Sequence, residues 1–469
     1  MRRFFYIHAS LILHPLYFNY FGIANFMQIK IRIMKQIFFS LALLLLFSCK
    51  SNTTQPPSNF NTLAENYVRL GLDIGRYDAA FIDAYYGPDS LQPSTPIKDI
   101  FPKDSLLNEV SKIQTALTEL LKSEKEDTII TRAKWMYAQL TAYGRRIKIY
   151  SGEYASFDEE SKELFDAVAP TFPESHYQEL VNKLDNVLPG EGSIPERFQT
   201  LANKFIIPKD KLDTVFKASI AECRKRTLAH YTLPTNEKFT LEFVNNKSWS
   251  GYNWYKGNYE SLIQINTDMQ IFIDRAIDVG SHESYPGHHV YNLLMEQHLY
   301  HEKGWVEISL YPLFSPQSLI AEGTANYGID VVFPGNEKVQ FCKEVLLPLA
   351  GLDTTGISNY FHALEVRGAL NFARNEVGRG IINHTMDSTE AMRWLKDYGL
   401  MNDETAMKSM HFINDYRTYI INYNYGLELV KNYVEAKGGT ADNPEKRWFA
   451  FAWLLSNPVL PSNLISTTK

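Results

Sequence analysis

The segment Ser281–His289, SHESYPGHH, contains the residue types of a hydrolytic zinc site. Histidine nitrogens and carboxylate oxygens are common zinc ligands, and a catalytic zinc usually has three protein ligands and one open position. In the familiar His-Glu-x-x-His helix the two histidines lie one turn apart, and the glutamate faces the reacting water. Here the residue four positions after His282 is Pro286, and the next histidines are His288 and His289. The segment therefore predicts a zinc site only if the helix is interrupted between its histidines.

Pro286 and Gly287 are suited to such an interruption. Proline removes the amide that would bond back to the His282 carbonyl and crowds that carbonyl, while glycine tolerates the distortion. A two-residue bulge would leave the rest of the helix in register and bring His288 to the one-turn position, whereas a longer excursion would present His289. We expect His282 and one of these two histidines to bind Zn²⁺, with His288 slightly favoured.

The third ligand is expected to be Glu322, in the stretch SPQSLIAEGTANYG. Ser315-Pro316 is typical of a helix start, and the small residues after Glu322 let a second helix approach closely. With these ligands assigned, Glu283 is left as the general base. It would take a proton from the water that attacks a carbonyl and hand it to the leaving amine.

Other side chains have the chemistry for supporting roles. The oxyanion formed during hydrolysis needs a further donor, for which Tyr327 and Tyr423 are candidates. Arg417 could pair with a substrate carboxylate. Tyr252 and Trp254, in an aromatic-rich segment, are candidates for substrate binding. For each of these residues a purely structural role is the competing interpretation.

A helical period dominates the sequence from about residue 63 onwards. One apolar stripe contains Leu107, Val110, Ile113, Leu117, Leu120 and Leu121, and similar stripes recur at 129–149, 177–188, 208–231, 357–383 and 405–436. Helix starts are marked by Ser193-Ile194-Pro195-Glu196 and by Ser388-Thr389-Glu390. We therefore predict a mainly α protein, with a helical N-terminal part at 61–205 and a catalytic helical part at 206–469.

Lys238–Asp268 departs from this pattern. Phe239, Leu241 and Phe243 alternate with polar residues, and a Gly/Asn-rich region precedes a second apolar run. This alternation predicts a short β-hairpin or small sheet immediately before the active-site helix.

The first sixty residues are typical of a bacterial lipoprotein precursor. Residues 34–49 combine a lysine, an apolar run too short to span a bilayer, and Cys49 after Leu-Phe-Ser, which resembles a lipobox. We expect Met34 to be the true start, 1–33 to be upstream sequence, Cys49 to be lipidated, and 50–60 to be a flexible tether. The protein would then lie at the cell envelope, anchored in the outer membrane or facing the periplasm.

Charge and cysteine content narrow the classes of partner. The net charge is −6, but residues 1–49 hold five basic residues and no acidic one, leaving 42 basic against 53 acidic residues, or −11, in the rest. This balance argues against nucleic acid as a partner, and a short peptide fits better. Cys223 and Cys342 could form one disulfide, which the sequence alone does not decide, although the setting of Cys223 favours a free thiol.

HESYPGHH followed by AEGTANYG resembles a large bacterial family of candidate lipoproteins of unknown function, which carries the pattern His-Glu-x-x-Pro-Gly-His-His and then Glu-Gly. The likeness extends to YVRLGLDIGRYDAAFIDAYYGP, to the segment before the motif, and to SNPVLPSNL near the end. The resemblance implies a mainly helical, gluzincin-type metallopeptidase fold, with His282, one following histidine and Glu322 as zinc ligands and Glu283 as base. Two departures, Ile382 where many members have histidine and Arg417-Thr418-Tyr419 where many have Pro-Gly-Gln, concern the substrate pocket.

The sequence thus predicts a lipid-anchored, zinc-dependent peptidase that acts on short peptides. Two alternatives stay open: a non-catalytic lipoprotein that binds a peptide or glycan, and a metal-dependent hydrolase of a non-peptide amide or ester. Retention of Glu283 favours an enzyme, because a binding protein has no need of a base beside metal ligands.

Overall fold

The structure is a computed structural model that describes residues 58–468, apart from 98 and 248. The chain divides into Met1–Gln55 and Pro56–Lys469, and only the second unit is considered below. The predictions for 1–33, the signal at 34–49 and most of the tether at 50–60 lie outside the described residues. Within the described residues, no helix combines the length and hydropathy needed to cross a membrane.

The described chain is mainly helical, as predicted. In α3 the residues Val110, Ile113 and Leu117 are buried as the period requires, but Leu106 takes the buried place expected for Leu107. The helices are α2 (Ser58–Gly75), α3 (Lys103–Ser123), α4 (Asp127–Tyr150), α5 (Phe157–Phe165), α6 (Glu174–Val187), α7 (Ile194–Ala202), α8 (Leu212–Leu228), α9 (Ile273–Glu283), α10 (His288–Met295), α11 (Pro316–Val332), α12 (Glu337–Phe341), α13 (Leu347–Ala350), α14 (Ile357–Ala369), α15 (Ala373–Ile382), α16 (Ser388–Asp397), α17 (Asp403–Tyr416), α18 (Ile421–Ala436), α19 (Pro444–Leu455) and α20 (Pro461–Thr468).

Local sequence signals set several helix ends. Ser193 and Glu196 form the predicted capping box at the start of α7, and Ser315 precedes Pro316 at the start of α11. The two longest predicted stripes are each divided. A 3-10 turn separates α14 from α15, and a left-handed backbone at Arg417, with φ of 52°, ends α17 before α18.

The segment before the active-site helix forms the small sheet that alternation predicted. Its strands are β2 (Lys238–Val244), β3 (Gly251–Tyr255) and β4 (Glu260–Asn266), in the order β2-β4-β3. β3 is antiparallel to β4, and β2 is parallel to β4. Because β3 is the last strand in the order, it is an edge strand. A second, two-stranded sheet pairs β1 (Ile82–Tyr85) with β5 (Leu310–Pro312), and the sequence pattern did not predict it.

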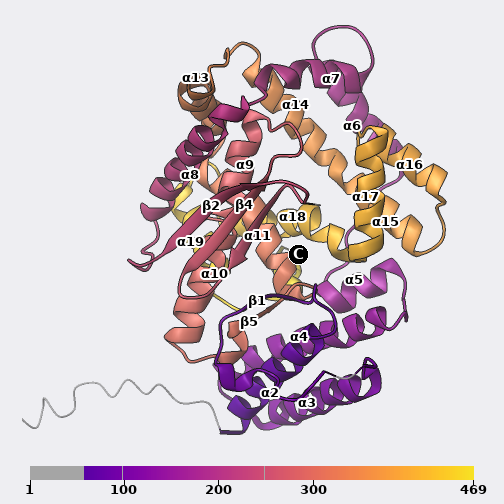
Figure 1. Cartoon of the computed structure of the whole chain (residues 1–469), viewed down its shortest axis with the longest axis vertical. Helices are drawn as coiled ribbons and strands as arrows, with labels where there is room; N and C mark the ends of the chain where they lie inside the picture. The colour runs from indigo at the N-terminus through magenta and orange to yellow at the C-terminus, as the bar shows by residue number, and fades with distance from the viewer. Residues whose placement is uncertain (1–57, 98, 248, 469) are drawn as a thin grey trace, which may run out of the picture. The chain divides into compact units, whose positions relative to one another are not determined.

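α11 packs closely against α18 in the middle of the helical part (Figure 1). A Cβ on Gly323 would lie 2.4 Å from the Gly426 carbonyl oxygen, so only glycine allows this approach. The expectation that small residues after Glu322 admit a second helix is therefore confirmed. Buried apolar residues from both 61–205 and 206–469 belong to one core cluster, and Cys223 and Cys342 are free, buried thiols.

Candidate metal centre

The motif occupies a break between two helices. α9 ends at Glu283 and α10 begins at His288, so the expected bulge inside one continuous helix is wrong. The connecting turn contains a cis peptide bond before Pro286, and the Gly287 amide donates to the Ser281 carbonyl at 3.1 Å. A Cβ on Gly287 would lie 1.9 Å from the His282 carbonyl oxygen, so this turn requires glycine.

This turn brings the rings of His282 and His288 together in an edge-to-face arrangement, with Glu322 of α11 next to both. The two Nε2 atoms are 3.1 Å apart, and Glu322 Oε2 lies 3.4 Å from His282 Nε2 and 3.7 Å from His288 Nε2. Among the described residues these three form a group that could hold a metal ion.

The donor atoms fit a zinc ion. Tetrahedral zinc with ligand distances of about 2.0–2.1 Å separates its ligand atoms by about 3.4 Å, close to the three distances found here. Glu322 Oε2 is buried and has no hydrogen-bond partner within the described structure. A buried carboxylate oxygen without a donor is costly, and a cation between it and the two imidazoles would remove that cost.

Hydrogen bonds determine which nitrogen of His282 faces the centre. The Asn326 amide donates to the Tyr423 carbonyl at 3.0 Å, so its side-chain oxygen is turned towards His282 Nδ1, at 3.1 Å. His282 therefore carries its proton on Nδ1 and directs the lone pair of Nε2 at Glu322, the arrangement that a metal-binding histidine needs.

Glu322 is held on its other side by Tyr419, whose hydroxyl donates to Oε1 at 2.9 Å. Burial would raise the pKa of Glu322, but the neighbouring imidazoles of His282 and His288 outweigh it and hold the pKa well below its usual range. Burial lowers the pKa of His282, whereas the nearby carboxylates of Glu322 and Glu283 raise it more, so the net shift is upward.

The structure turns His289 away from this group. Its Nδ1 lies 2.8 Å from Ser261 Oγ and its Nε2 lies 3.1 Å from Glu237 Oε2, and its side chain is fully buried. Consecutive residues on a helix point about 100° apart, so His288 and His289 cannot both face Glu322. Of the two histidines left open by the sequence, the geometry of α10 brings only His288 to the candidate metal centre.

Glu283 lies beside the metal-binding group at the end of α9. Its side chain is mostly buried, and Oε1 would be 3.2 Å from a Cβ placed on Gly251 of β3. Asn253, on the same strand, donates to the Glu283 carbonyl at 2.7 Å. The edge strand β3 is thereby attached to the end of α9, and its glycine leaves room for the carboxylate.

Of the two tyrosine candidates, only Tyr423 is near the site groups. Burial raises the pKa of Tyr423 well above its usual range, and the charges of Glu322 and Glu283 add to the shift, so the hydroxyl stays a neutral donor. Burial raises the pKa of Tyr327 to about 12, but the charges that act on this hydroxyl belong to other residues, and its ring packs on Phe451. Five helical residues turn about 140° from Glu322, so Tyr327 points elsewhere.

Asp83 of β1 is a site neighbour that the sequence reasoning missed. It accepts a hydrogen bond from the Tyr252 hydroxyl. Burial raises the pKa of the Asp83 carboxyl to about 6, although that hydrogen bond and the charge of His288 oppose the shift. Tyr252 therefore lies close to the centre, whereas Trp254, whose ring is tilted against that of Tyr252 at 4.4 Å, is 41% exposed further along β3. No local signal marked Asp83, because the β1–β5 pairing that positions it joins distant segments.

Arg417 is committed to another partner. Its Nε and Nη2 donate to both carboxylate oxygens of Glu160, at 2.6 and 2.8 Å, and Glu160 is fully buried. The guanidinium also lies over the Tyr154 ring, at 4.3 Å. A bidentate pair of this kind ties α5 to the end of α17 and leaves Arg417 unsuited to holding a substrate carboxylate.

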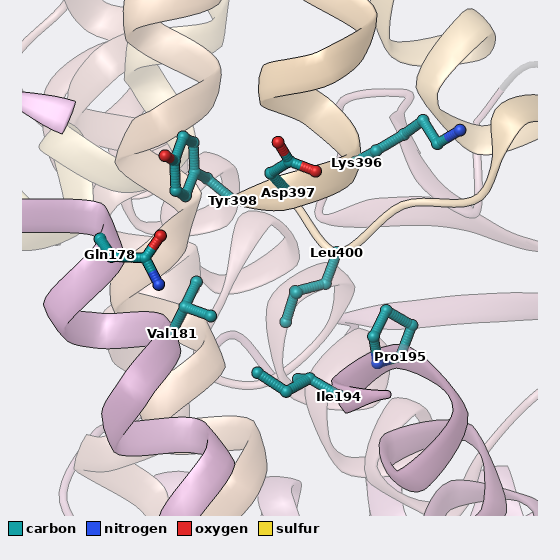
Figure 2. A pocket seen from close by; sticks show the side chains of 8 residues that line it. All are labelled: Gln178, Val181, Ile194, Pro195, Lys396, Asp397, Tyr398 and Leu400. Atoms are coloured by element: carbon teal, nitrogen blue, oxygen red, sulfur yellow. The ribbon is translucent and has the colours of Figure 1, made fainter. Parts of the chain in front are cut away.

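A hollow of about 280 Å³ lies between α6, α7 and the end of α16 (Figure 2). Gln178, Ile194 and Tyr398 are among the residues that line it, and none of the residues of the candidate metal centre does. Its lining includes Lys396, Asp397 and Tyr398 but no histidine or cysteine.

No protein-family model and no curated protein sequence matches the chain. A crystal structure of a protein described as a candidate lipoprotein from Colwellia psychrerythraea is similar, with a TM-score of 0.51, 13% identity, and coverage of 78% of this chain and 69% of that one. Metallocarboxypeptidase 1 of Trypanosoma cruzi has a TM-score of 0.47, 12% identity, and coverage of 87% and 95%. An M32 carboxypeptidase from Deinococcus radiodurans R1 has a TM-score of 0.41, 11% identity, and coverage of 88% and 95%. At this identity, the similarity to the Colwellia protein is one of fold.

Proposed function

We propose that the protein is a zinc-dependent hydrolase, and specifically a peptidase that acts on short peptides. One observation carries the proposal: His282 Nε2, His288 Nε2 and the unpartnered Glu322 Oε2 converge, with the carboxylate of Glu283 beside them. When bound at such a site, zinc polarises a carbonyl oxygen and makes a bound water more acidic.

The protein's own residues would divide the remaining work. Glu283 accepts a proton from the attacking water and passes it to the leaving amine. Tyr423, a neutral donor at working pH, stabilises the negative oxygen that develops on the substrate. The edge strand β3 offers backbone groups to an extended peptide, next to Glu283.

We further propose that Cys49 anchors the mature protein by lipid at the bacterial cell envelope, and that the chain belongs to the candidate-lipoprotein family which its motifs resemble. The fold shared with the Colwellia protein supports this proposal. Labelling of the full-length protein with a radioactive fatty acid, in wild type and Cys49→Ala, tests it; label retained by the variant would refute the anchor.

The enzyme proposal is tested by measuring bound zinc and the cleavage of a short-peptide library. We expect about one zinc per chain and cleavage in wild type, zinc without turnover in Glu283→Gln, and loss of zinc in Glu322→Gln. Stoichiometric zinc with no peptide cleaved would favour a hydrolase of a non-peptide amide or ester. A protein without zinc would favour the binding role, for which the adjoining, mutually tilted rings of Trp249, Tyr252 and Trp254 offer a surface.

A further inference from the structure

Arg374 of α15 is a half-buried cation that lacks a carboxylate partner. Its Nε donates to Ser409 Oγ at 3.2 Å, and its guanidinium carbon lies 5.9 Å from the centre of the Phe412 ring. Across the described residues, no carboxylate lies within ion-pair distance of it, and neither terminal amino group has a hydrogen-bond partner. Burial lowers the pKa of Arg374.

Neighbouring arginines of comparable burial are paired. Arg379, on the same helix, contacts Glu376 and Asp158, and Arg417 is bidentate to Glu160. A guanidinium removed from water is costly unless an anion pairs with it. The unpaired fork of Arg374 is therefore suited to an anion that arrives with a ligand, and a planar carboxylate matches its geometry.

Arg374 is connected to the candidate metal centre through Tyr423. The charges of Arg374, Glu322 and Glu283 all act on the Tyr423 hydroxyl. The Phe412 ring, which Arg374 overlies, is 6.3 Å from the Tyr423 ring, and Tyr423 lies 5.7 Å from Tyr419, the donor to Glu322. A continuous series of contacts therefore runs from Arg374 through Phe412, Tyr423 and Tyr419 to Glu322.

We propose that Arg374 binds the C-terminal carboxylate of the substrate, so that the enzyme removes residues from the C-terminal end of short peptides. This inference rests on the proposed peptidase function. Successive Cα atoms are about 3.8 Å apart, so the carbonyl to be attacked would lie one residue before a terminal carboxylate held by Arg374. In the reaction the C–N bond breaks, the hydroxyl of water joins the acyl carbon, and the proton taken by Glu283 goes to the leaving amino group.

Arg367 of α14 is a matched control. Its guanidinium is half-buried over the Phe198 ring, at 4.7 Å, and like Arg374 it has no carboxylate at ion-pair distance in the described chain. The charges that act on it belong to Asp274 and Tyr360 and to none of the metal-centre residues. Removing Arg367 removes a similar cation without touching the proposed carboxylate site.

The experiment compares an N-terminally blocked tetrapeptide as the free acid and as the C-terminal amide, using the zinc-loaded enzyme and mass spectrometry of the products. We expect wild type to release the terminal amino acid and to prefer the free acid by about 10- to 150-fold in kcat/KM, as hydrogen bonds to a charged group predict. Arg374→Gln should lose this preference, Arg374→Lys should keep part of it, and Arg367→Gln should retain it. The readout is the ratio of acid to amide cleavage, because a folding defect or a changed environment of Tyr423 would slow both substrates and leave the ratio as in wild type.

Each contrary result separates the two proposals. Equal cleavage of acid and amide by wild type, cleavage only at internal bonds, or an unchanged preference in Arg374→Gln overturns the role of Arg374 and leaves the peptidase standing. If Arg367→Gln loses the preference for the free acid and Arg374→Gln keeps it, the substrate carboxylate binds at Arg367 and not at Arg374. If zinc-loaded wild type cleaves neither this peptide nor any member of the library, the peptidase proposal fails and the carboxylate proposal fails with it.

Discussion

Replacing Asn326 should weaken zinc binding although Asn326 is not a ligand. Its side chain accepts from His282 Nδ1 at 3.1 Å and donates to the Tyr423 carbonyl at 3.0 Å. In Asn326→Ala both contacts are lost, and neither tautomer nor ring orientation of His282 is held. Loss of such a supporting hydrogen bond typically lowers metal affinity by about 10- to 100-fold, which corresponds to about 1.4–2.7 kcal/mol.

The assay is competition for zinc between the protein and a chromogenic chelator, with thermal unfolding of the metal-free protein as a measure of folding. Asn326→Asp is the informative second variant, because a carboxylate can accept from His282 Nδ1 but cannot donate to the Tyr423 carbonyl. We expect Asp to restore zinc affinity to within about threefold of wild type while turnover stays reduced, since Tyr423 loses its support. Wild-type zinc affinity in a folded Asn326→Ala protein would refute the reasoning.

Three further predictions follow from particular contacts. Gly287→Ala should lower both zinc content and Tm, because its Cβ would lie 1.9 Å from the His282 carbonyl oxygen. Gly144→Ala on α4, where a Cβ would meet Val110 at an ordinary contact distance of 3.8 Å, should keep the zinc content and not lower Tm. Wild-type zinc in Gly287→Ala would count against the turn geometry. Arg417→Ala should lower the free energy of unfolding by about 3–5 kcal/mol, because it leaves the buried Glu160 carboxylate without its partner, whereas Arg393→Ala, nearer the surface, should lower it by less than about 1 kcal/mol. Turnover per bound zinc should be unchanged in Arg417→Ala. A selective loss of turnover would indicate that Arg417 binds substrate after all. Burial opposes ionisation of Glu237, but hydrogen bonds from His289, Tyr285 and Arg224 lower its pKa from 4.5 to about 2. Its ionised form therefore stabilises the fold above pH 4.5, and this contribution is lost as the pH falls towards 2. In urea unfolding, the difference in stability between wild type and Glu237→Gln should close over that range, and a constant difference would disprove the assignment.

Features that depend on nearby residues were predictable from the sequence. The capping box of Ser193, the start of α11 at Pro316 and the small sheet before α9 all follow from patterns a few residues long. The prediction of one continuous helix through the motif was wrong because it also relied on a local pattern. A Pro-Gly pair is compatible both with a bulge inside a helix and with a full break between two helices.

Features that depend on distant segments were not predictable. Asp83 and Arg374 approach the site from β1 and α15, and no local pattern distinguishes them from surface charges. Asn326 carried a signal that was not used, since it lies four residues after Glu322 and so on the same helix face. Helical geometry alone also argues against Tyr327, five residues after Glu322.

The most direct test of the metal centre is a crystal structure of the zinc-loaded protein with anomalous data collected at the zinc absorption edge. We predict one peak, about 2.0–2.2 Å from His282 Nε2, His288 Nε2 and a carboxylate oxygen of Glu322, and none beside His289. A peak between His289 and Glu237, or no peak at His282, would contradict the assignment of the site.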